Sequence, residues 1–178
     1  LFTMAGFMPL GPAMPNGLGP AAVRCALVSE NAQLIGFTLT NGHTRGGVDL
    51  EDPDGRGGGV LGYPPLSIVS NCIIIANAAH GQGGGSFQAK VKNSQIIGNE
   101  ATYGAGAYYG TISNCLVASN RAAQDGGGIY NAAIHACIIQ GNHAAGYGGG
   151  IYKGWDTRNC LIVENQAASW TSAPSRAA

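Results

Sequence analysis

The fold is decided by a short stretch, NCLVASNRA at 114–122, together with GGGIY at 126–130, which follows it. Versions of the same stretch recur along the chain. They are NCIIIANAA at 71–79, NSQIIGNEA at 93–101, ACIIQGNHA at 136–144 and NCLIVENQA at 159–167. The second positions of these copies, 72, 94, 115, 137 and 160, are 22, 21, 22 and 23 residues apart. A steady period of this length indicates a repeat architecture in which each copy is one structural unit.

Glycine-rich segments lie between the copies, and an aromatic residue follows each of them. The other examples are GGGSF at 83–87, GAGAY at 104–108 and GGGIY at 148–152. An earlier, divergent copy reads LIGFTLTNG at 34–42, and an insertion at 43–56 separates it from its own glycine triplet. We therefore expect a solenoid over residues 22–168. Since solenoid ends expose unpaired strand edges, we expect residues 1–21 and 169–178 to be terminal caps or extensions.

The residue types in the repeat distinguish between the possible solenoids. A leucine-rich repeat needs leucine at several fixed positions, but Ile, Val, Cys and Ala fill the apolar positions here. Helical repeats are longer, and glycine triplets would break their helices. β-branched residues favour strands and glycine favours corners, so the sequence predicts an all-β parallel β-helix. We expect about six rungs of ~22 residues, each with three short strands.

Aligning the copies places like residues in columns. Alternation predicts that two apolar columns point inward. They are Val69, Val91, Ile112 and Ile134, and Ile74, Ile96, Val117, Ile139 and Ile162. Two asparagine columns lie at expected corners: Asn71, Asn93, Asn114 and Asn159, and Asn77, Asn99, Asn120, Asn142 and Asn165. Asparagine tolerates left-handed turns and can pair its amide with the asparagines above and below, so both columns predict ladders.

The combined pattern, Asn-Cys-x-Ile-x-x-Asn-x-Ala followed by Gly-Gly-Gly-x-Tyr, resembles the right-handed parallel β-helix repeats of the pectate lyase-like superfamily. The segment GFTLTNG at 36–42 is similar to the opening turn of bacterial surface proteins in that group. The resemblance implies a right-handed coil and an extracellular or cell-surface location. It does not imply one function, because the superfamily contains lyases, hydrolases, adhesins and binding modules.

Composition excludes other classes of protein. The chain has 178 residues, with 9 Lys and Arg against 9 Asp and Glu, so it lacks the basic surface that dominates nucleic-acid binding. The apolar run at 1–14 contains prolines and is shorter than the ~20 residues needed to cross a bilayer, so we expect no membrane span. Because the chain does not begin with Met, we interpret it as part of a longer, multidomain protein.

Cysteines and histidines give no catalytic motif. Cys72, Cys115, Cys137 and Cys160 share one column with Ser94, which predicts small, buried packing residues with free thiols. A disulfide between neighbouring rungs is the alternative. The four histidines fall at different repeat positions, so we expect no catalytic triad.

One acidic cluster lies in the insertion. Asp49, Glu51, Asp52 and Asp54 could wrap a calcium ion, which takes six to eight oxygen ligands. The same residue types are typical of a solvated turn, and we favour that interpretation. We expect no other cofactor.

The resemblance also implies what an enzyme of this group would need: acids on strands that hold Ca²⁺ beside an Arg or Lys in lyases, or grouped aspartates in hydrolases. The remaining acids are Glu30, Glu100, Asp125, Asp156 and Glu164. No two of them share a column in adjacent rungs, as a paired acid and base would require. We therefore expect a non-catalytic module for polysaccharide binding or surface adhesion. A polysaccharide lyase or glycoside hydrolase fragment, with a cleft beside 43–56, is the alternative.

The predicted ligand site is aromatic. Phe87, Tyr108, Tyr130 and Tyr152 recur every 21 or 22 residues and are expected to point outward, where rings can stack on sugars. Tyr109 and Trp155 would add neighbouring contacts. Two alternatives remain open: the rings stack on one another over the glycine turns, or a protein partner covers the apolar outward columns that begin at Ile73 and Ile75.

Overall fold

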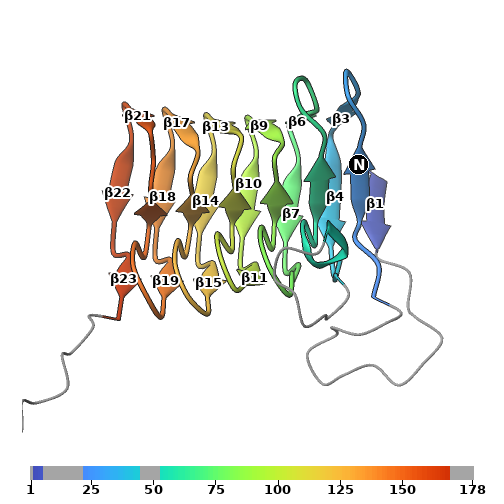
Figure 1. Cartoon of the computed structure of the whole chain (residues 1–178). Coiled ribbons are helices and arrows are strands. Elements are labelled where there is room, and N and C mark those ends of the chain that lie inside the picture. Colours follow the sequence, from blue (N-terminus) through green and yellow to red (C-terminus); the bar gives the residue numbers. More distant parts are fainter. Residues whose placement is uncertain (1, 6–21, 45–52, 169–178) are drawn as a thin grey trace, which may run out of the picture.

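The computed structural model describes residues 2–5, 22–44 and 53–168. These residues form a right-handed parallel β-solenoid of about five turns of about 22 residues (Figure 1). Each strand pairs with strands one turn away, and the turns stack along one axis from β1 to β23. The prediction of an all-β parallel β-helix is confirmed. Among the described residues, no helix is long and apolar enough to cross a membrane.

Four parallel sheets run along the solenoid. Sheet A contains β1 (Phe2–Ala5), β4 (Phe37–Thr40), β7 (Ile73–Ile75), β10 (Gln95–Ile97), β14 (Leu116–Ala118), β18 (Ile138–Gln140) and β22 (Leu161–Val163). Sheet B contains β2 (Ala26–Val28), β5 (Val60–Gly62), β8 (Ser86–Phe87), β12 (Ala107–Tyr108), β16 (Ile129–Tyr130) and β20 (Ile151–Tyr152). Sheet C contains β3 (Gln33–Ile35), β6 (Ile68–Ser70), β9 (Lys90–Lys92), β13 (Thr111–Ser113), β17 (Ala133–His135) and β21 (Asp156–Arg158).

Sheet D is narrow and was not predicted. It contains β11 (Glu100–Ala101), β15 (Arg121–Ala122), β19 (His143–Ala144) and β23 (Gln166–Ala167). A full turn therefore passes through A, D, B and C, with four strands in place of the expected three. In the first turns, sheet D is reduced to isolated bridges at Ala78, so the number of complete turns is smaller than the six expected rungs.

The core is a stack of apolar residues inside the coil. Both predicted inward columns lie there, and Ile74, Ile96, Ile112 and Ile134 are fully buried. Parallel pairing in register places Ile96 between Ile74 and Val117, so each side chain packs on its equivalent one turn away. The same column ends at Ile162, which is 48% exposed on the last described strand of sheet A.

The second asparagine column is a buried hydrogen-bonded ladder. The Asn99 side-chain amide nitrogen donates to the Asn120 Oδ1 at 3.0 Å, and the Asn99 backbone N–H donates to the same oxygen at 2.9 Å. Equivalent bonds join Asn77 to Asn99, Asn120 to Asn142 and Asn142 to Asn165. Because each amide also donates to a sheet A carbonyl, such as that of Ile74, the ladder satisfies polar groups at the A–D corner.

The third glycine of each triplet lies against this ladder. A Cβ at Gly128 would lie 2.5 Å from the Gly150 carbonyl oxygen and 3.1 Å from the Asn142 side-chain nitrogen. The chain passes so close to the next turn and to the ladder that the third glycine has no room for a side chain.

The insertion and the ends are described in part. β1 extends sheet A by pairing with β4, Phe2 opposite Phe37. The insertion begins at the partly buried His43 and ends in the short 3-10 helix η1 (Pro53–Gly55). The rest of the expected caps, 6–21 and 169–178, and the middle of the insertion, 45–52, lie outside the described residues.

Candidate functional site

A pocket with exposed aromatic side chains lies at the corner where sheet B leads into sheet C. Its volume is about 300 Å³. Residues from four turns line it: Pro64, Pro65, Gln88, Lys90, Tyr109, Gly110, Thr111 and Trp155. The first three turns are successive, and Trp155 lies two turns beyond Tyr109. We call it the B–C pocket. Its volume is at the lower end of the range typical of ligand sites, and it combines apolar rings with a few polar groups, as such sites do.

Backbone conformation at the corner turns Tyr109 outward. Gln88, Tyr109, Asn131 and Lys153 occupy the same corner in successive turns, all with φ between 52° and 57°. In these four turns, the left-handed residue directly follows the sheet B strand and reverses the alternation of side chains. The Tyr109 ring is held edge-on against Tyr108, with ring centroids 4.8 Å apart at 85°. Tyr109 lines the pocket and is 40% exposed.

Trp155 supplies the second ring. It is 65% exposed and lies in the loop between β20 and β21. Its backbone N–H donates to the Ala132 carbonyl at 3.3 Å, which fixes the loop to the preceding turn. An exposed tryptophan is a large apolar surface in contact with water, and stacking on a ligand would remove that surface from water.

The polar groups of the pocket are cationic or neutral. Lys90 is exposed at the start of β9, next to the half-buried Gln88 and Thr111. Lys92 points outward from the same strand. No acidic residue lines the pocket. The pocket thus offers an ammonium group, an amide and a hydroxyl beside two aromatic rings.

The other four predicted aromatic residues form a stack on sheet B. The ring centroids of Phe87 and Tyr108 are 5.6 Å apart, those of Tyr108 and Tyr130 are 4.6 Å apart, and those of Tyr130 and Tyr152 are 5.0 Å apart. Phe87 is 3% exposed and Tyr108 is 8% exposed. The Arg56 guanidinium lies over Phe87, and the Lys153 ammonium lies over Tyr130 and Tyr152. The faces of these rings are therefore used largely within the protein.

The structure divides the predicted site residues into two groups. Tyr109 and Trp155, expected only as neighbours, share the B–C pocket, whereas Phe87, Tyr108, Tyr130 and Tyr152 share the stack. The sequence analysis missed Pro64, Pro65, Gln88 and Lys90. The available signal was the common repeat position of Gln88 and Tyr109, because residues in one column lie side by side in adjacent turns.

The predicted calcium ligands are mostly beyond the described residues. Asp49, Glu51 and Asp52 lie there, and Asp54 is exposed in η1. No group of three His, Cys, Asp or Glu residues that could hold a metal ion occurs in the part of the chain that the structure describes.

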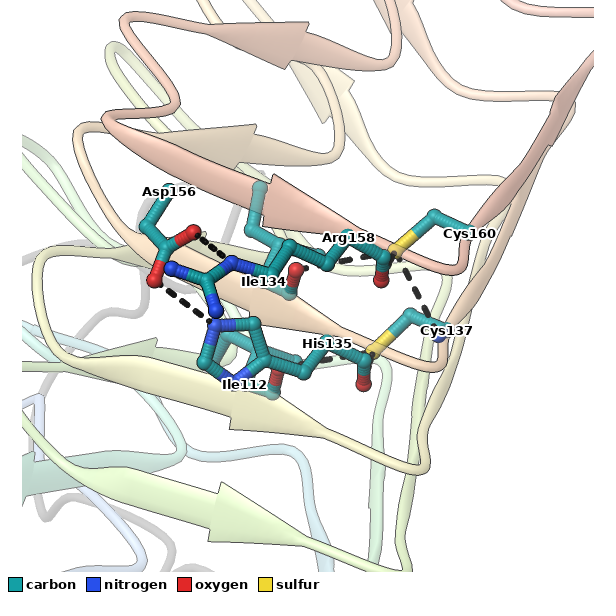
Figure 2. A network of polar contacts seen from close by, with 7 residues as sticks. All are labelled: Ile112, Ile134, His135, Cys137, Asp156, Arg158 and Cys160. Atoms are coloured by element: carbon teal, nitrogen blue, oxygen red, sulfur yellow. Dashed lines mark hydrogen bonds and ion pairs between the residues drawn. The ribbon is translucent and has the colours of Figure 1, made fainter.

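One carboxylate has close polar partners on sheet C. The Asp156 Oδ2 is 3.1 Å from the His135 Nε2, and the Arg158 Nε donates to the Asp156 Oδ1 at 2.7 Å (Figure 2). The hydrogen bond with His135, and then that from Arg158, hold the pKa of Asp156 below its ordinary value. In the register of sheet C, Asp156 lies opposite Ala133, and Ala133 lies opposite Thr111. This column therefore gives Asp156 no second carboxylate to act with as an acid–base pair.

Four of the five cysteines, Cys72, Cys115, Cys137 and Cys160, form a column at the corner between sheets C and A, and Cys25 lies apart, just before β2. All five cysteines are free, and only Cys160 is not buried. Each column thiol donates to the carbonyl two residues earlier, as Cys137 does to His135 at 3.2 Å (Figure 2). Ser94 makes the same bond, to Lys92 at 2.7 Å, and its hydroxyl accepts from the Cys72 N–H. The column thus satisfies backbone polar groups as well as filling space.

Electrostatics within this column do not produce a reactive thiol. The neighbouring Cys115 thiol lowers the pKa of Cys137 to about 7, and the same interaction, together with burial, raises the pKa of Cys115. Cys137 is only 1% exposed, so its sulfur is shielded from reagents in solution.

Comparison with protein-family models, with curated proteins and with solved structures finds no match. The structure shows a parallel β-solenoid, and an argument on function starts from the site itself.

Proposed function

We propose that this protein is a non-catalytic module that binds polysaccharide in the B–C pocket, at a cell surface or outside the cell. The observation that carries the proposal is the pair of exposed rings, Tyr109 and Trp155, in a pocket with Lys90. Aromatic faces suit the C–H faces of sugar rings, and the polar groups suit hydroxyls. The finer assignment to the pectate lyase-like superfamily, and adhesion as the biological use of binding, belong to the same proposal.

The charge of the pocket favours acidic sugars. Lys90 and Lys92 both point outward from β9, and the pocket lining contains no carboxylate that would repel a uronic acid. An ammonium group gains from a ligand carboxylate through a charge-assisted hydrogen bond. We therefore expect alginate or pectin to bind more tightly than neutral xylan.

Affinity electrophoresis through gels that contain alginate, pectin or xylan tests the site. The pocket variant carries Tyr109→Ala and Trp155→Ala. We expect it to bind alginate at least about tenfold more weakly, because each ring contributes roughly 0.5–1.5 kcal/mol beyond the area it buries. The matched control carries Tyr130→Ala and Tyr152→Ala, which removes two rings of the stack instead.

The comparison of these two variants decides the location of the site. Retardation that is lost in the pocket variant and kept in a folded stack variant supports the B–C pocket. The opposite pattern would move the site to the stack, and the absence of retardation of the native chain in every gel would overturn the proposal.

A turnover assay tests the proposal that the module is non-catalytic. We expect no new unsaturated products or reducing ends after incubation with pectin, alginate or xylan, with or without Ca²⁺, because no paired acid and base stands at the pocket. Sustained product formation by the native chain would contradict the proposal of a non-catalytic module and show that the protein is an enzyme.

A further inference from the structure

A second hollow lies over sheet D, away from the B–C pocket. It is a groove of about 440 Å³. Four successive turns contribute its lining: residues 78–80, 100–102, 121–123 and 145. Along each turn the chain passes through sheets A, D, B and C, so sheets A and B separate this groove from sheet C. Figure 1 shows the strands of sheets C and D at opposite ends of the turns.

The shape of the groove suits one extended chain. Crossing four turns makes it about 14 Å long, at ~4.8 Å for each strand spacing. A volume of about 440 Å³ over that length leaves room for one polymer chain but not for a helix. Its floor follows Ala79, Ala101 and Ala122 of successive turns, whose side chains are buried in a small core cluster, so no large side chain fills the groove there. Successive sugar units of a linear glycan advance by roughly one strand spacing, so each turn can meet an equivalent unit.

The charges in the groove balance. Glu100 and Arg121 lie opposite each other in the register of β11 and β15, and both are exposed. Within the described residues, neither side chain makes a hydrogen bond or an ion pair. A ligand with net charge of either sign would meet one like charge. A hydroxyl can donate to the carboxylate and accept from the guanidinium, so neutral polyhydroxyl chains satisfy both groups.

We propose that the sheet D groove is a second glycan-binding site, which takes a neutral sugar chain along the solenoid axis. Together with the B–C pocket, it makes the protein a cross-linker that holds an acidic and a neutral polysaccharide at once. The cross-linking rests on the proposed function, whereas neutral-chain binding at the groove stands on the groove alone. Two sites on separate faces can engage two chains without a new contact between them.

The test uses the full chain, sodium alginate as the acidic probe and arabinoxylan as the neutral probe. The groove variant carries Glu100→Ala and Arg121→Ala, two exposed positions outside the core. A second groove variant, Ala123→Leu, narrows the exposed part of the floor and keeps both charges. The matched control carries Gln95→Ala and Gln140→Ala, exposed positions on sheet A outside both hollows. Affinity electrophoresis measures binding to each probe, and light scattering of the mixed polymers measures cross-linking.

We expect both groove variants to bind arabinoxylan at least about fivefold more weakly than the native chain does. Their affinity for alginate should be unchanged. The pocket variant, Tyr109→Ala with Trp155→Ala, should show the reverse, and only the native chain and the control should raise the scattering of the mixture. Arabinoxylan binding that is absent in the native chain, or unchanged in both groove variants, overturns the groove site. Arabinoxylan binding that depends on the groove while alginate does not bind leaves the groove standing, and overturns the acidic-glycan pocket and the cross-linking.

Discussion

The two asparagine columns differ in what the fold requires of the same residue. Asn71, Asn93, Asn114 and Asn159 are exposed at the C–A corner, with φ between 51° and 53°. In the second column, Asn77, Asn99, Asn120 and Asn142 are buried, and the left-handed position belongs to the residue before each of them. The first column provides a left-handed backbone, with one exposed amide bond from the Asn114 Nδ2 to the Asn93 Oδ1 at 3.3 Å, whereas the second provides a buried ladder of amides. Substitutions should therefore have very different costs in the two columns.

The largest expected effect is at Asn120. Its Oδ1 accepts two hydrogen bonds from Asn99, and its side-chain nitrogen donates to Ile96 and Asn142. Asn120→Ala removes these bonds and leaves buried polar groups without partners, each at about 1–3 kcal/mol, so we expect a loss of about 3–5 kcal/mol. Urea unfolding followed by circular dichroism measures it. A loss below about 1 kcal/mol would show that water or local rearrangement replaces the amide.

An intermediate effect is expected in the cysteine column. The Cys115 thiol donates to the Ser113 carbonyl at 3.1 Å, and the thiol also accepts from the Ser94 backbone. Cys115→Ala removes both bonds, and we expect a loss of about 1–2 kcal/mol. Cys115→Ser should cost less, because Ser94 already makes the equivalent bonds one turn earlier. The same urea unfolding measures both substitutions. Equal losses of unfolding free energy would show that the column contributes packing and not hydrogen bonds.

A smaller effect is expected at Asn114, in the first column. Asn114→Ala keeps the left-handed backbone but removes the polar side chain that lets asparagine adopt it readily, which costs about 1 kcal/mol. Ala136 occupies the equivalent position with φ of 52°, so the corner accommodates alanine. Asn114→Gly should leave the stability unchanged or raise it slightly, since glycine adopts this conformation freely. If thermal unfolding shows Asn114→Gly to be as harmful as Asn120→Ala, the distinction between the two columns is wrong.

The smallest expected effect is the pH dependence of stability that Asp156 causes. Asp156 forms a surface ion cluster with His135 and Arg158, which has no part in either ladder. Its pKa in the folded chain lies below the ordinary value of 3.8. A lowered carboxyl pKa stabilises the fold above that ordinary value, and the contribution is lost as the pH falls through the folded-state pKa. Melting temperatures of the native chain and Asp156→Asn should therefore differ slightly at pH 6 and converge below pH 3. A difference that grows on acidification would contradict this sign.

The aromatic residues show where prediction from the sequence ends. Their period of 21 or 22 residues correctly places Phe87, Tyr108, Tyr130 and Tyr152 in one column, because equivalent residues of a solenoid must lie one above another. The period does not say how the rings tilt. Packing decides that the first three rings stack nearly parallel, that Tyr152 is tilted by 57° against Tyr130, and that Tyr109 turns away at a left-handed corner.

The sequence by itself determined the parallel coil, its inward columns such as Ile74 and Ile96, and the corners marked by glycine and asparagine. These follow from local preference and repetition: each turn meets a near-copy of itself, so residue type and period fix the register. Only the tertiary structure decided the fourth sheet, the burial of the amide ladder and the joining of Pro64, Lys90 and Trp155 in one pocket. Those residues lie in different turns and different repeat positions. Their proximity depends on the geometry of each corner and on the points where loops of unequal length rejoin the sheets. The residue types in a single column of the repeat do not contain that information.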